Sequence, residues 1–125
     1  MLNAFEQYKK TSINTMTKSE LLILLFDEVI KKLNHSKVLM EQKNFENAKI
    51  NLEKVRNIFV YLMVNLDEKY EVSRELSDIY IFFNTEIIKA SSMKSVKYID
   101  EILPMVKELR DTWEEAGKIA KTVKK

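Results

Sequence analysis

Apolar residues that recur at intervals of three and four are the feature that most limits the fold of this chain. The clearest run lies within residues 44–66, where seven apolar positions follow one another at these intervals. Such spacing places side chains on one face of an α-helix, which turns every 3.6 residues. Residues 71–91 and 95–120 repeat the pattern. The three stripes are Phe45, Ala48, Leu52, Val55, Phe59, Leu62 and Leu66; Val72, Leu76, Ile79, Phe83, Ile87 and Ala90; and Ile99, Ile102, Val106, Leu109, Trp113, Ala116 and Ala120.

The composition also favours an all-α fold. Among 125 residues there are one Gly and one Pro, so the residues that tight β-hairpins need are nearly absent. The chain has no Cys, which excludes disulfides and thiolate metal ligands and fits a reducing, cytoplasmic location. With His35 as its single histidine, an ordinary His-rich metal site is also excluded. We therefore expect no metal, no cofactor and no catalytic residues, and the chain is predicted not to be an enzyme.

Local signals place the ends of the helices. Thr17 and Glu20 have the spacing of a capping box, which predicts that the first long helix begins near Thr17. Asn44 is a suitable cap for the second helix. Pro104 lacks an N–H group and crowds the carbonyl of Asp100, so we expect a kink in the last helix but no break. The predicted helices span residues 17–42, 44–66 and 71–91, and the last one begins at residue 95.

These signals divide the chain into three parts. Residues 1–16 are predicted to form a partly ordered apolar leader, because polar Thr and Ser residues interrupt its helical pattern. Residues 17–120 are predicted to form an antiparallel up-and-down four-helix bundle, since short connections favour antiparallel neighbours. Residues 121–125 form a basic tail.

The chain has more apolar residues than the core of a bundle needs. Leu21 to Phe26 point in every direction around the first helix, whereas a bundle helix needs one apolar face. An exposed patch of this kind usually marks an interaction surface. Three alternatives remain for what covers this patch: the leader, a second copy of the chain, or the amphipathic helix of a partner. The other surplus residues are Ile58, Val60, Tyr61, Met63, Tyr80, Ile81, Phe82 and Ile88.

Other functional classes receive weak support. Acidic and basic residues alternate along most of the chain and leave a formal net charge of +2, so no nucleic-acid surface is predicted. The longest apolar run is too short to span a bilayer, so no membrane insertion is predicted. A lone helical histidine is also typical of histidine phosphotransfer domains, but Val38 and Leu39 occupy the positions of the Lys and Gly in their motif.

Four segments together resemble the family of flagellar secretion chaperones. The segment 109–116, with sequence LRDTWEEA, is similar to the closing signature of that family, and residues 21–30 resemble its first helix. Residues 4–8 resemble its aromatic leader, and Leu66-Asp67 with the later Leu76 and Tyr80 match its landmarks around the third helix. The chain departs from the pattern by lacking a Gly-Gly after Asp67 and by carrying Glu28 where the family has Gly.

The resemblance implies a function and a set of site residues. It implies a chaperone that binds the disordered C-terminal segment of flagellin, prevents premature polymerisation and delivers the subunit to the flagellar export apparatus by type III secretion. It further implies that leader residues cap a groove whose wall includes part of the first helix. The flagellin-binding residues expected on this basis and among the surplus apolar residues are Phe5, Tyr8, Ile13, Leu22, Leu25, Phe26, Asp27, Ile58, Tyr61 and Tyr80.

Overall fold

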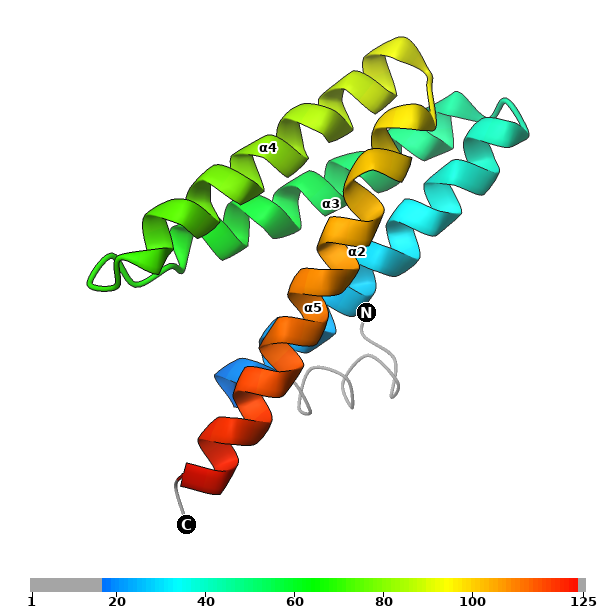
Figure 1. The fold of residues 1–125 in the computed structure, drawn as a ribbon. Helices are drawn as coiled ribbons and strands as arrows, with labels where there is room; N and C mark the ends of the chain where they lie inside the picture. Colours follow the sequence, from blue (N-terminus) through cyan, green and yellow to red (C-terminus); the bar gives the residue numbers. More distant parts are fainter. Residues whose placement is uncertain (1–16, 124–125) are drawn as a thin grey trace, which may run out of the picture.

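Four helices make up the part of the chain that the computed structural model describes, namely the backbone of residues 17–123 and the side chains of residues 17–118 (Figure 1). Helix α2 packs against α3 and α5, and α4 also packs against α3 and α5. Successive helices run in opposite directions (Figure 1). The predicted antiparallel four-helix bundle is thereby confirmed. The helices are α2 (Lys18–Glu41), α3 (Phe45–Val64), α4 (Val72–Met93) and α5 (Lys97–Val123).

Side-chain caps begin the first two of these helices where the sequence predicted. The Thr17 hydroxyl accepts the backbone N–H of Glu20 at 3.2 Å, and Asn44 Oδ1 accepts the N–H of Asn47 at 3.4 Å. Each bond satisfies an N–H group that has no partner within the helix. Helix α5 begins two residues later than expected and then continues through Pro104 without a break.

Four aromatic rings form the centre of the core. The ring of Phe59 lies 6.4 Å from that of Phe26, 5.8 Å from that of Tyr80 and 5.2 Å from that of Phe83. These residues come from α2, α3 and α4, and α5 closes the core with aliphatic side chains. Each buried ring removes a large apolar area from water, and tilted or edge-on pairs add a smaller favourable term. The buried apolar side chains of α5 are Ile99, Ile102, Leu103 and Val106.

Helix α4 buries most of the stripe that the sequence predicted, namely Leu76, Phe83, Ile87 and Ala90, but it differs from the prediction at two positions. Tyr80 was expected on the surface but is buried, while Val72 was expected in the core and is exposed. Ser73 takes the inward position instead, where its hydroxyl donates to the backbone carbonyl of Asp67. Residues 79–83 are all apolar, so helical spacing alone could not decide which of them face the core.

Contacts between α2 and α5 follow one antiparallel register along most of both helices. Lys37 Nζ lies 2.7 Å from Asp100 Oδ1, and Arg110 Nε lies 2.8 Å from Asp27 Oδ1. Figure 1 shows the α3–α4 pair leaving this α2–α5 pair at an angle. The start of α2, before Phe26, and the end of α5, after Trp113, consequently extend beyond the packed core. Ala116, expected on the core stripe, lies in this extension and is exposed.

The single glycine of the chain allows the two extended helix ends to approach closely. Gly117 on α5 is buried, and a Cβ atom placed there would lie 3.0 Å from Oγ and 3.1 Å from Cβ of Ser19 on α2. Substitution Gly117→Val should therefore lower the free energy of unfolding by about 1–3 kcal/mol, because the larger side chain forces α2 and α5 apart. Urea denaturation measures the change. Ala116→Val is the matched control, since Ala116 is exposed, and a control with an equal loss would contradict this explanation.

Lysines occupy two left-handed backbone positions where glycine is usually found. Lys43 follows α2 with φ of 60°, and Lys94 follows α4 with φ of 51°. A left-handed conformation costs a residue with a Cβ atom about 1 kcal/mol. Lys43→Gly should raise the free energy of unfolding by about 0.5–1 kcal/mol, measured by the urea midpoint. Lys54→Gly, within α3, should lower it by a similar amount. An equal loss in both variants would show that Lys43 is not strained.

Candidate binding site

The first half of α2 carries the surplus apolar residues of the bundle. Leu21, Leu22, Ile23, Leu24 and Leu25 follow one another, and each is partly exposed. Their exposure follows from the fold, because this part of α2 extends beyond the packed core (Figure 1). Leu22 and Leu25 also pack on the edge of the core. The segment therefore offers apolar surface on a helix that its neighbours hold in place.

Two residues of α3 extend this apolar surface. The side-chain amide of Asn51 donates to His35 Nδ1 at 2.9 Å, which fixes the register between the antiparallel helices α3 and α2. Counted from that bond, Tyr61 and Leu25 each lie ten residues along their helices, and Ile58 lies one turn closer to the bond than Tyr61. Ile58 is partly buried and Tyr61 is 46% exposed. We name Leu25, Ile58 and Tyr61 the α2–α3 strip.

Two predicted site residues lie inside the core. Phe26 has no exposed surface and Tyr80 has almost none, and their rings lie 6.4 Å apart. Burial raises the pKa of the Tyr80 phenol to about 12, and the nearby indole of Trp113 partly opposes this shift. The Trp113 N–H does not reach hydrogen-bond geometry with it, and no other described residue accepts from this N–H. In this conformation, Phe26 and Tyr80 support the surface from below and offer none of their own.

Asp27 lies on the other side of α2 and joins it to α5. Arg110 donates to Asp27 through two nitrogens, at 2.8 Å and 3.5 Å, and to Glu114 at 2.7 Å. These bonds raise the pKa of the Arg110 guanidinium, with Asp27 as the largest contributor. Asp27 therefore acts as an inter-helix contact beside the apolar segment. Sequence reasoning gave no role to Arg110, although Asp27 and Arg110 each lie in a segment that resembled the chaperone family.

Other candidate residues contribute less to the site. Leu109 and Trp113 are partly buried on α5 and pack against the core. His35 is exposed on α2, and one of its ring nitrogens is engaged by Asn51. Leader residues Phe5, Tyr8 and Ile13 lie outside the described residues, so their predicted role is not addressed by the structure.

Metal binding and membrane insertion find no support in the described part of the chain. No three His, Cys, Asp or Glu side chains gather there in a way that could hold a metal ion. None of the four helices of residues 17–123 has the length and apolar character needed to cross a bilayer.

Comparison with known proteins assigns the chain to a family. The family model "Flagellar protein FliS" matches residues 1–120. The flagellar secretion chaperone FliS of Bacillus subtilis (strain 168) is 25% identical over 114 residues, which cover 91% of this chain and 86% of that protein. The flagellar secretion chaperone FliS of Escherichia coli (strain K12) is 24% identical over 110 residues, covering 86% of this chain and 81% of that protein.

A solved structure supports the same fold. A crystal structure of a bacterial flagellar chaperone superposes with a TM-score of 0.77 and 21% identity, over 92% of this chain and 95% of the other. At 21% identity, the similarity supports the arrangement of the helices alone. The family model, in contrast, spans nearly the whole sequence, and the chain therefore belongs to the FliS family of flagellar secretion chaperones.

Proposed function

We propose that this chain is a cytoplasmic export chaperone that binds the disordered C-terminal segment of flagellin. Binding would prevent premature polymerisation, and the complex would then deliver the subunit to the flagellar export apparatus for type III secretion. Membership of the FliS family supports the proposal. The observation that carries it in the structure is the run of five partly exposed apolar residues, Leu21 to Leu25, at the start of α2.

The α2–α3 strip is the surface that we propose for binding such a client. A disordered segment loses conformational entropy when it orders on a surface, so it needs apolar contacts to offset that cost. Leu25 and Ile58 give the strip a base that is packed on the core, and Tyr61 adds a half-exposed ring. An amphipathic helix of the client could lay its apolar face along this surface. We propose that Leu22, Leu25, Ile58 and Tyr61 contact the client.

The remaining predicted residues have proposed roles that differ from direct contact. Phe26 and Tyr80 would hold the strip in position from the core, and Asp27 would fix α2 against α5 through Arg110. Leader residues Phe5, Tyr8 and Ile13 would cover the apolar surface when no client is bound. A cover of this kind lowers the apparent affinity in proportion to the fraction of molecules in which it is closed.

Isothermal titration calorimetry against a synthetic peptide from the C-terminal end of a cognate flagellin tests this function. We expect one-to-one binding with a negative heat-capacity change, because apolar surface is buried, and an increase in helicity by circular dichroism. No binding by the folded chain to a soluble peptide would contradict the proposal. In that case, the apolar run on α2 would be better explained as a surface for self-association.

A single substitution tests the position of the site. Tyr61→Asp should weaken peptide binding by about tenfold or more, since it places a carboxylate in an apolar contact. Val38→Asp is the matched control, because Val38 is 47% exposed, close to the 46% of Tyr61, but lies in the second half of α2. Equal affinities of the two variants would remove the α2–α3 strip from the client site.

A further inference from the structure

The outer side of the α3–α4 pair has apolar residues that neither α2 nor α5 covers within the described part of the chain. Asn84 Nδ2 donates to the backbone carbonyl of Arg56 at 3.3 Å, which fixes the register of the two antiparallel helices. Val60 on α3 then lies level with Ile81 on α4, and about half of each side chain is exposed. Val64 on α3 and Ile88 on α4 are also exposed, and they lie on opposite sides of Val60 and Ile81 along the helix axes. We name Val60, Val64, Ile81 and Ile88 the α3–α4 seam.

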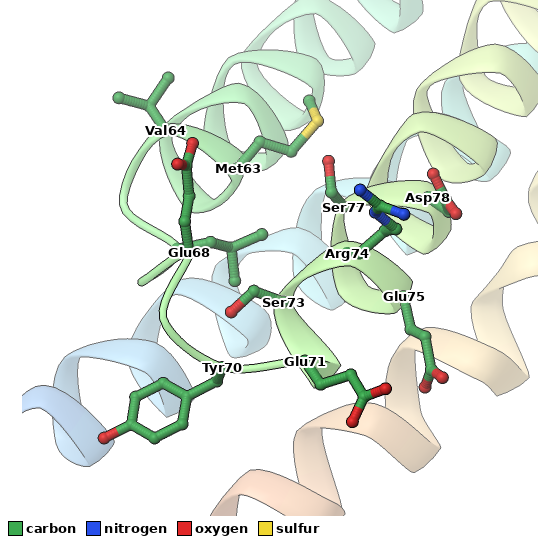
Figure 2. Close-up of a pocket in the computed structure, with 11 residues that line it drawn as sticks. Met63, Val64, Glu68, Tyr70, Glu71, Ser73, Arg74, Glu75, Ser77 and Asp78 are labelled. Carbon is green, nitrogen blue, oxygen red and sulfur yellow. The ribbon is translucent and has the colours of Figure 1, made fainter.

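A cavity lies at each end of the seam. The larger one has a volume of about 870 Å³ and is lined by Met63 and Val64 at the end of α3 and by residues from Glu68 to Asp78 (Figure 2). The smaller one has a volume of about 140 Å³ and includes Lys49, Arg56 and Ile88 in its lining. The surface is thus hollow at both ends and apolar between them.

The two ends carry opposite charge. Glu68, Glu71, Glu75 and Asp78 line the larger cavity with a single cation, Arg74. Figure 2 shows Glu68, Glu71, Glu75 and Asp78 among the side chains that line this cavity. The smaller cavity has two cations, Lys49 and Arg56, against one carboxylate, that of Glu53. The seam is therefore acidic at one end and basic at the other.

These charges have no partners of their own within the described part of the chain. The ion pairs of the bundle involve Lys32, Lys37, Lys89, Arg110 and Lys118, and none of them includes a charged residue that lines either cavity. Two buried polar atoms beside the smaller cavity, Arg56 Nε and Asn84 Oδ1, also lack a hydrogen-bond partner among the described residues.

We propose that the α3–α4 seam is the interface of a homodimer, in which a second copy of the chain packs against the first in the antiparallel direction. A surface that is acidic at one end and basic at the other complements itself when it is turned by 180° about an axis through its centre. A second copy of the chain therefore matches both charged ends of the seam, and no further partner is needed. The surface is distinct from the α2–α3 strip, and the inference does not depend on flagellin binding.

The register indicates which residues would meet. With the two-fold axis near Val60 and Ile81, these side chains pack against their counterparts in the partner subunit. Lys49 lies eleven residues, or about 16 Å, before Val60 on α3, and Glu68 lies beyond the opposite end of α3, so in the proposed dimer each lysine meets the acidic end of the other copy, where we place Glu68 opposite it. Helices of 20 and 22 residues are about 30 Å long, and side by side they present a face on the order of 600 Å². A standard interface uses about 800 Å² per partner, so the size is of the right order.

Sedimentation velocity of the full chain over a wide concentration range tests the dimer. The unmodified protein should show a reversible monomer–dimer equilibrium, and Ile81→Asp should be monomeric at every concentration. Lys49→Glu and Glu68→Lys should each raise the dissociation constant about tenfold, because each change acts twice across the axis. An equimolar mixture of these two variants should associate as tightly as the unmodified protein, since every lysine then faces a glutamate again.

Controls make the outcome decisive. Lys31→Glu alters a cation that is exposed on α2, away from the seam, and should leave association unchanged. A chain that stays monomeric at its highest soluble concentration would overturn the proposal. So would a dimer that persists in Ile81→Asp but is lost in Leu25→Asp, because association would then occur through α2. A mixture of Lys49→Glu and Glu68→Lys that associates no better than either variant alone would overturn the predicted pairing, even if Ile81→Asp failed to fold.

Discussion

The contact of Phe26, Phe59, Tyr80 and Phe83 determines how the helices can be arranged. These rings come from three helices and fill the centre of the core, so α2, α3 and α4 have to meet at this level. Phe26 is only eight residues from the start of α2. Everything before it lies beyond the ring cluster, where no aromatic ring of this cluster covers the helix. The partly exposed run Leu21 to Leu25 is thus a consequence of where the largest core residues lie.

Much of this fold could be predicted from the sequence, because the apolar stripes of α3 and α5 have one clear phase. The stripe of α4 was predicted correctly at Leu76, Phe83, Ile87 and Ala90, but spacing did not single out Tyr80, because residues 79–82 are all apolar and consecutive. Tyr80 packs against Phe59 in the core, whereas Val72, the first residue of α4, is exposed. The same difficulty affected the candidate site. Phe26 lies within a continuous apolar run, where spacing does not separate a core ring from a surface one.

Charged residues of this bundle fall into two groups with different roles. Asp27 and Arg110 hold α2 against α5, and Glu114 adds a further bond to the same guanidinium. A shared Arg with several carboxylates is worth more than an isolated surface pair, since one ordered side chain serves several bonds. Lys49, Glu68 and Asp78 make no such contact with other described residues. Sequence alone could not distinguish the groups, because the partners of Arg110 include a residue 83 positions away.

The separation of 83 positions between Asp27 and Arg110 has a consequence for how the bundle opens and closes. Contacts of α2 with α3 and of α3 with α4 join neighbours in the chain, so these helix pairs close short loops. The pairing of α2 with α5 closes the longest loop, and it is also the pairing whose outer part lies beyond the aromatic core. Segments of this kind exchange their amide protons through local opening well before the whole protein unfolds. The apolar start of α2 therefore belongs to the least protected cooperative unit of the bundle, and local fluctuations expose it more readily than any ring of the core.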